Sequence, residues 1–488
     1  MKKFFLSFVA LVAMVGMLNA QRTWAYDLDL VVKDGGPNAY TFTFTASTDV
    51  VSANLVFLKA DGTEAGKVAL SNVVKGENSV ELTAAQIPGT GELTWAVELT
   101  GAAIDAMVEL TDASTTEIYN YYLPQDVAVD NNPESDYFGT IYVAEGTDGA
   151  SDGGSDRADT QKRGIFVYNQ ALEELNPTSN VGILPANAAS LMTDVSRQAI
   201  HRMAVNPVNN NVAFCYNVEG ATAVWSMNPA NLAGDAVNLI EGLAITKANA
   251  LCFDAEGTLY VLDNANTSDG GKVVKVVNGE LVTIAQNGIW GVQDISLVSD
   301  GRGGLWIAQN RWAVDAYAVL SHVNAAGEVD YSVTASSADA GLFPNDANAS
   351  YRGQCAYNVA EDILAFGGNK VVTLFQVTYD ATTGVPSLTK LLSTPALGSN
   401  IDGVAFDYAG DLYVVSASSE RFYKFAVPTA TNTCTTPAKK NLVVVKGGDE
   451  SAVDNITVST KTAKIVRNGQ VLVVRDGKTF NLLGQEVK

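Results

Sequence analysis

The stretch GVAFDYAGDLYVVS, residues 403–416, decides the fold. It consists of a short apolar strand ending in Asp407, a polar turn that contains glycine, and a second strand of β-branched and aromatic residues. Two short strands separated by such a turn predict a β-hairpin. The same pattern recurs along the middle of the chain, and this recurrence is the strongest structural signal in the sequence.

Six copies of the first strand can be aligned, and most of them end in Asp or Asn. They are DVAVD (126–130), RMAVN (202–206), ALCFD (250–254), DISLV (294–298), QCAYN (354–358) and GVAFD (403–407). A second strand follows each copy, then a third, and in several copies a weaker fourth. Six such units, each of about fifty residues, predict the blades of a six-bladed β-propeller over residues 107–428.

The last unit lacks a fourth strand of its own. After Val427 the chain turns to Pro, Thr and Asn, whereas the segment 107–120, which precedes the first unit, is strand-like. We therefore predict that this earlier segment supplies the outer strand of the last blade and closes the ring.

Four further segments flank the predicted propeller. The predicted fold class of the chain is all-β. Residues 1–20 combine two lysines, an apolar run and small residues, which predicts a signal peptide and export. Residues 26–105 predict a small immunoglobulin-like β-sandwich. The Thr-rich residues 429–440 predict a linker. Residues 441–488 contain the turns Asn468-Gly and Asp476-Gly, which predict a C-terminal β-module built as a three-stranded meander.

Charge and composition limit the partners of this 488-residue chain. A net charge of −22 argues against nucleic acid, which requires a basic surface. Beyond the signal peptide, no stretch is long and apolar enough to predict a transmembrane helix.

Cys215, Cys252 and Cys355 lie in strand patterns and are interpreted as buried apolar residues, with a disulfide left open. The sequence leaves the oligomeric state open.

Two parts of the sequence resemble known families. The ending IVRNGQVLVVRDGKTFNLLGQEVK (465–488) resembles the C-terminal segments of secreted and surface proteins of the Bacteroidetes, some of which are type IX secretion sorting domains. The six-unit pattern resembles NHL and SMP-30/gluconolactonase-like propellers. Within it, IDGVAFD (401–407) is similar to the strand entry that carries a metal-binding Asp in the lactonases, which implies that role for Asp402. Other motifs of that family, including its Ser-Pro-Asp-Gly run, are absent, which argues against lactonase activity.

Polar residues recur at the start of the first strands, where six strands of a propeller converge on the channel. We predict that they form a ligand-binding mouth, with Arg202, Asp294 and Asp402 as its charged members. The alternative is a water-filled channel whose polar groups only satisfy one another. The predicted ligand-binding residues are Gln125, Asp126, His201, Arg202, Asn249, Gln293, Asp294, Gln354, Asp402 and Trp290. Trp290 is included because an indole near a strand end can stack on a sugar ring, with inter-blade packing as the alternative.

Calcium is the cofactor that the sequence suggests. The loop GTDGASDGGSDRADT (146–160) places carboxylates among Gly and Ser, where a flexible backbone can wrap a hard cation. The predicted metal ligands are Asp148, Asp152, Asp156 and Asp402. A solvated excursion of the first blade is the alternative for the loop.

These observations together predict an exported protein, secreted or attached to the cell surface, that binds a glycan, peptide or protein at the propeller mouth without catalysis. The first alternative is a calcium-dependent lactonase, hydrolase or lyase that uses Asp402 and His201 at the same mouth. The second is a structural or adhesive surface component. No nucleophile motif accompanies His201, and His322 lies in a third strand, where it is interpreted as structural.

Overall fold

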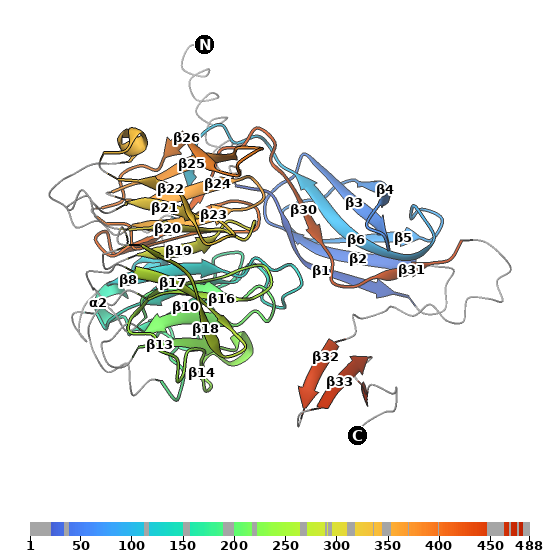
Figure 1. The fold of residues 1–488 in the computed structure, drawn as a ribbon. Helices are drawn as coiled ribbons and strands as arrows, with labels where there is room; N and C mark the ends of the chain where they lie inside the picture. Colours follow the sequence, from blue (N-terminus) through green and yellow to red (C-terminus); the bar gives the residue numbers. More distant parts are fainter. Residues whose placement is uncertain are drawn as a thin grey trace, which may run out of the picture. The chain divides into compact units, whose positions relative to one another are not determined.

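The chain divides into two compact units. The computed structural model describes residues 21–33, 39–111, 117–149, 157–188, 200–216, 222–263, 271–287, 290, 295–309, 318–334, 336–343, 353–368, 370–398, 400–446, 463–467, 470–475 and 478–481. Unit 1 comprises Met1–Ala106 and Pro428–Lys488, and unit 2 comprises Met107–Val427. The described elements of both units are mainly antiparallel β-strands (Figure 1).

Unit 2 contains six antiparallel sheets, named I to VI in chain order, among its described residues. Sheet I comprises β8 (Pro124–Val129), β9 (Ile141–Glu145) and β10 (Gly164–Tyr168). Sheet II comprises β11 (Met203–Val205), β12 (Val212–Tyr216), β13 (Ala223–Met227) and β14 (Val237–Asn238). Sheet III comprises β15 (Ala248–Phe253), β16 (Leu259–Asp263), β17 (Gly271–Val277) and β18 (Glu280–Asn287). Sheet IV comprises β19 (Ser296–Ser299), β20 (Leu305–Ala308), β21 (Leu320–Val323) and β22 (Val329–Val333). Sheet V comprises β23 (Gln354–Asn358), β24 (Ile363–Gly367), β25 (Val372–Tyr379) and β26 (Pro386–Ser393). Sheet VI comprises β27 (Gly403–Phe406), β28 (Leu412–Ser416), β29 (Arg421–Ala426) and β7 (Val108–Glu109). The short helices of the unit are η1 (Glu117–Tyr119), α2 (Arg157–Thr160), η3 (Pro229–Asn231) and η4 (Ala338–Leu342).

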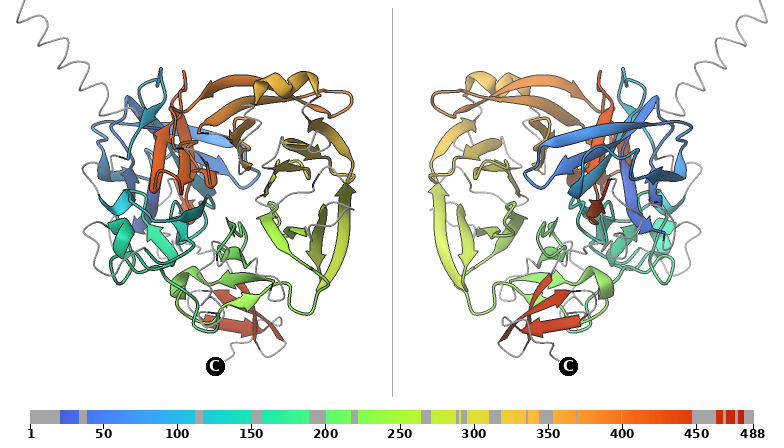
Figure 2. Two further views of the ribbon diagram at one scale, coloured as in Figure 1. Left: turned by 90° about the vertical axis from the view of Figure 1, so that its left-hand side faces the viewer. Right: turned by 90° about the vertical axis from the view of Figure 1, so that its right-hand side faces the viewer.

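The six sheets form a ring. Their first strands, called the inner strands below, contact one another in the cyclic order β8, β11, β15, β19, β23, β27 and back to β8. Six apolar cores fill the spaces between neighbouring sheets, and the last of them joins sheet VI to sheet I. Figure 2 shows these sheets around a common centre. This arrangement is that of a β-propeller, in which each sheet buries both faces against its neighbours.

The segment before the first sheet closes the ring, as predicted. β7 pairs antiparallel with β29, matching Glu109 with Phe425 and Val108 with Ala426. Just beyond β7, the amide of Leu110 donates to the carbonyl oxygen of Lys424 at 2.8 Å. The outer edge of sheet VI is therefore covered by residues that precede sheet I in the chain.

The Asp or Asn at the end of each inner strand, in it or directly after it, has a shared structural role. In all six sheets its Oδ1 atom accepts a hydrogen bond from the backbone amide two residues later, which folds the turn into the second strand. These residues are Asp130, Asn206, Asp254, Asp300, Asn358 and Asp407. The repeated acidic and amide residues of the sequence thus build turns.

Unit 1 consists of two sheets that enclose one core. One sheet has the order β1 (Ala25–Val32), β2 (Ala39–Ala46), β5 (Gly76–Thr83), and the other has the order β30 (Thr433–Pro437), β6 (Gly91–Thr100), β3 (Ser52–Lys59), β4 (Glu64–Leu70). The core between them contains Phe42, Phe57 and Trp95, and the rings of Phe42 and Trp95 lie 4.9 Å apart.

The structure differs from the predicted linker at residues 429–440. This segment contains β30, which pairs with β6 from Thr433 opposite Thr100 to Pro437 opposite Ala96. The next strand, β31 (Leu442–Val444), also pairs with β6, and Leu442 is buried in the core of unit 1. The physical reason is that Thr favours strands when an unpaired sheet edge is at hand, although the same composition without such an edge is typical of a linker.

The C-terminal residues form the predicted meander. β32 (Ala463–Arg467), β33 (Gln470–Arg475) and β34 (Lys478–Asn481) pair in chain order. The predicted signal peptide, residues 1–20, lies outside the described residues. Within the described part of the chain, no helix is long and apolar enough to span a membrane.

Candidate functional site: the channel of the ring

The structure brings seven of the predicted mouth residues to the starts of the inner strands. All seven are buried, with at most 6% of their surface exposed: Gln125, Asp126, His201, Arg202, Asn249, Gln354 and Asp402. Gln293 and Asp294 lie outside the described residues. These seven polar residues therefore lie in the interior, at the end of the channel where the inner strands begin.

Arg202 ties four of the sheets together at this end. Its Nη1 atom donates to the carbonyl oxygens of His201 at 2.8 Å, Gln125 at 3.1 Å and Asp402 at 3.2 Å. Its Nε atom donates to the carbonyl oxygen of Ile295 at 3.1 Å. A guanidinium presents its donors in a fixed fork, so one side chain can hold backbones of sheets I, II, IV and VI in register.

Asp126 links sheet I to sheet II beside this guanidinium. Its Oδ1 atom accepts from the amide of Val127 at 2.9 Å, and its Oδ2 atom accepts from the amide of Met203 at 2.7 Å. Burial raises the pKa of Asp126 to about 7, although Arg202 and the two amides favour the ionised form. Sheet VI approaches closely here, since a Cβ atom on Gly403 would lie 2.6 Å from the Cα atom of Asp126.

A second buried carboxyl group lies at the end of β9. Glu145 is fully buried, and it accepts hydrogen bonds from the amides of Tyr122, Leu123 and Thr147. Burial raises the pKa of Glu145 to about 8, against the opposing effect of these amides. This carboxyl group holds the segment that leads into β8.

The surroundings of Asp402 do not fit a divalent cation. Its Oδ2 atom accepts from the amide of Ala417 at 2.6 Å, and its carbonyl oxygen accepts from Arg202. Calcium requires about six to eight oxygen ligands, and a guanidinium bonded to one of the donors would repel it. The metal role that the lactonase resemblance implies for Asp402 therefore finds no support in this donor set.

The predicted calcium loop is described only at its edges. Asp148 accepts from the amide of Arg163 at 3.1 Å and lies 3.9 Å from the Nζ atom of Lys162. Asp152 and Asp156 lie outside the described residues. Across the described residues, no group of three or more His, Cys, Asp or Glu side chains is placed to hold a metal ion.

The channel contains a cavity of about 210 Å³, called the inner cavity below. Residues of all six inner strands line it. Its polar end includes Arg202, Asp126 and Gln354. The inner strands also turn one unpaired backbone edge toward the centre of the ring, because each pairs only with the second strand of its own sheet.

A larger cavity of about 490 Å³, called the opening cavity below, lies where the inner strands end. It adjoins the inner cavity, since the two share lining residues that include Val129, Val205 and Phe253. The turns after the inner strands complete it with Pro133, Pro207 and Val359, among others. The sequence did not predict this site, because a lone Val or Pro in a turn carries no chemical signature. The recurrence of apolar residues next to the turn Asp or Asn could have indicated it.

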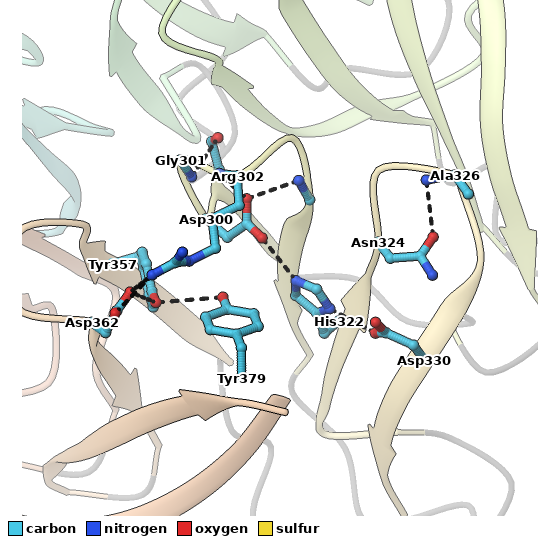
Figure 3. Close-up of polar contacts among 12 residues, drawn as sticks. Asp300, Gly301, Arg302, His322, Asn324, Ala326, Asp330, Tyr357, Asp362 and Tyr379 are labelled. Atoms are coloured by element: carbon cyan, nitrogen blue, oxygen red, sulfur yellow. Dashed lines mark hydrogen bonds and ion pairs between the residues drawn. The ribbon is translucent and has the colours of Figure 1, made fainter. Parts of the chain in front are cut away.

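Both histidines are buried. His201 is 3% exposed and His322 is 2% exposed. Figure 3 shows His322 between two carboxylates, with its Nε2 atom 3.1 Å from Asp300 and its Nδ1 atom 2.6 Å from Asp330. Its ring also packs on Trp306, with centroids 4.7 Å apart. Because both ring nitrogens are engaged and enclosed, His322 braces sheet IV, as the sequence indicated.

Arg302 forms a different kind of pair in the same region. Its Nη2 atom contacts both carboxylate oxygens of Asp362, at 2.9 and 2.8 Å, and its guanidinium lies over the ring of Tyr379 (Figure 3). The side chain of Arg302 is 52% exposed. This pair joins sheet IV to sheet V at the surface, whereas His322 acts in the interior.

Trp290 is not placed to stack on a ligand. It has no exposed surface, it belongs to the core between sheets III and IV, and its indole nitrogen donates to Ser321 Oγ at 3.2 Å. The physical reason is that a large indole fills the wedge between two sheets, which is the inter-blade packing named above as the alternative.

Comparisons with known proteins leave the family open. No family model and no curated protein matches the chain. Among solved structures it is similar to a gluconolactonase from Xanthomonas campestris, with 12% identity over 68% of this chain and 90% of that chain and a TM-score of 0.40. It is also similar to an auxiliary nutrient binding protein from Bacteroides ovatus, with 10% identity over 82% and 98% of the two chains and a TM-score of 0.41. At such values these likenesses carry no argument about function.

Proposed function

We propose that this chain is an exported six-bladed β-propeller protein that binds a peptide or protein segment at the opening cavity and does not transform it. In this proposal the sheets of unit 1 form an immunoglobulin-like sandwich, and the meander β32–β34 belongs to a C-terminal sorting-like module. The observation that carries the proposal is an apolar hollow at the centre of one face of the ring.

Two exposed aliphatic side chains lie at or beside this hollow. Val208, next to the lining residue Pro207, is 61% exposed, and Val359 is 53% exposed. Apolar residues grouped around a concavity are typical of binding sites, whereas apolar residues scattered singly are common on any surface. Acidic residues of the neighbouring turns, including Asp254 and Glu256, favour a ligand that carries positive charge beside its apolar group.

The composition of the hollow favours a peptide over a glycan. Aliphatic residues and proline make up half of its lining, and Phe253 is the aromatic residue in it. Sugars are commonly bound by stacking on exposed aromatic faces, but Trp290 and Trp306 are both buried. The buried positions of His201 and His322 favour binding over acid–base catalysis.

A peptide selection tests this proposal. The full mature chain would be screened against a random peptide library, and the recovered peptides would be measured by calorimetry against the wild type and the double variant Val208→Ser/Val359→Ser. We expect peptides with an apolar residue next to Lys or Arg, and a loss of affinity of at least about tenfold in the variant.

Two other exposed aliphatic residues provide the matched control. Val237 is 63% exposed and Leu391 is 45% exposed, and they lie on outer strands β14 and β26. The variant Val237→Ser/Leu391→Ser should bind as the wild type does. Equal loss in both double variants, or recovery of no peptide, would reject the opening cavity as the binding site.

A further inference from the structure

Two buried hydrogen-bond donors reach the inner cavity without a described protein partner. The Nη2 atom of Arg202 and the Nε2 atom of Gln354 both lack one. Arg202 is 2% exposed and Gln354 is 1% exposed, and both line the inner cavity. Burying a donor without an acceptor is costly, so such groups usually mark the place of a missing partner.

The charged side chains that line this end of the cavity are Arg202 and Asp126, and burial raises the pKa of Asp126 to about 7, so below this pH the guanidinium is the charge that a ligand meets. The described hydrogen bonds of Arg202 all run to neutral backbone carbonyls, so none of them joins its guanidinium to a carboxylate. Asp126 lies nearby, but both of its oxygens accept backbone amides. The carboxylate of Asp402 accepts from Ala417, and Asp402 is not among the lining residues.

The inner cavity is large enough to hold more than one water molecule. Its volume of about 210 Å³ far exceeds the room that a single water needs, on the order of 15 Å³. It is smaller than a pocket for a drug-sized ligand, which is about 300 Å³ or more. A small organic molecule matches this range, and the adjoining opening cavity gives it a route to Arg202.

We propose that the inner cavity binds a small monocarboxylate, whose oxygens accept hydrogen bonds from Arg202 Nη2 and Gln354 Nε2. A carboxylate has two oxygens that can accept from two donors, here from Arg202, directly before β11, and from Gln354 at the start of β23, and the guanidinium is the side chain best suited to it. This site does not depend on peptide binding, because it lies deeper and uses no residue of the exposed rim.

Thermal unfolding and calorimetry of the full mature chain test the site. The probes are sodium acetate and sodium propionate, with sodium chloride and sodium phosphate at equal ionic strength as references. We expect the carboxylates to raise the melting temperature in a saturable way. The variant Gln354→Leu, which keeps the size of the side chain and removes the donor, should weaken carboxylate binding at least tenfold.

Controls keep folding and binding apart. Gln86→Leu, an exposed substitution in unit 1, should bind carboxylate as the wild type does. Arg202→Lys keeps the charge but loses the Nη2 donor, and it should also lose the effect. Should that variant fail to fold, Gln354→Leu decides the question. Equal shifts with chloride, equally tight phosphate, or full binding by Gln354→Leu would each overturn the proposal. The peptide assay with Val208 and Val359 is unaffected by any of these outcomes.

Discussion

His322 and Arg302 show how burial sets the contribution that a polar side-chain contact makes to stability. The carboxylate of Asp300 is buried, which raises its pKa, but the hydrogen bonds from His322 and from the amides of Arg302 and Gly304 bring the pKa below its ordinary value. Removing His322 would take one hydrogen bond from each of two largely buried carboxylates, those of Asp300 and Asp330. Removing Arg302 would leave Asp362 near water.

We therefore expect His322→Leu to destabilise the chain by about 2–4 kcal/mol, because Asp300 and Asp330 each lose one hydrogen bond in a largely buried setting. Arg302→Met, the matched control from the same pair of sheets, should cost less than about 1 kcal/mol, since the exposed ion pair is screened by solvent. Chemical denaturation of both variants measures the difference. Equal effects would contradict the bracing role of His322.

The raised pKa values of Asp126 and Glu145, about 7 and about 8, predict a pH dependence of stability. Between the ordinary pKa of a carboxyl group and these values, the folded chain holds protons that the unfolded chain has released. Stability from these groups is therefore complete below about pH 4 and is lost as the pH rises through about 7 to 8. Asp126→Asn should flatten this decline in denaturation curves measured between pH 5 and 8. Asp136→Asn, an exposed control, should leave it unchanged.

At the scale of the strand, the approach of β27 to β8 depends on a residue without a side chain. A Cβ atom on Gly403 would lie 2.4 Å from Asp126 Oδ1 and 2.6 Å from its Cα atom, and a backbone atom cannot swing aside. Gly403→Ala should thus destabilise the ring by about 1–3 kcal/mol. Gly341→Ala, where a Cβ atom meets nothing within 4 Å, should be close to neutral. A similar melting temperature for both variants would refute this close approach.

The strands show what the sequence could and could not predict. Recurring runs of β-branched and aromatic residues with turn residues between them predicted the repeated sheets, and the missing fourth strand of the last repeat predicted the closing role of 107–120. β30 was missed because its partner β6 lies more than three hundred residues earlier, as the pairing of Cys434 with Leu99 shows. At the site, alignment identified Arg202 and Asp126, but it could not predict that Arg202 binds backbone carbonyls, which have no sequence signature.

At the scale of the whole molecule, unit 1 is discontinuous in the chain. Its sheet is completed by β30 and β31, which follow unit 2, and Val444 belongs to its core. A chain ending at Val427 should therefore melt about 10 °C lower in the transition of unit 1. A chain ending at Lys446 keeps both strands, lacks β32–β34, and should melt as the full chain does. Scanning calorimetry compares them, and identical transitions in the two truncated chains would contradict the role of β30.

The late pairing of β7 and β6 has a consequence for biosynthesis. Both strands are synthesised early, whereas their partners lie in the region 421–444, which is synthesised only after the first five sheets of the ring. A prematurely terminated chain would present two open strand edges at once, and open edges invite aggregation and proteolysis. One short segment of the chain therefore completes both units.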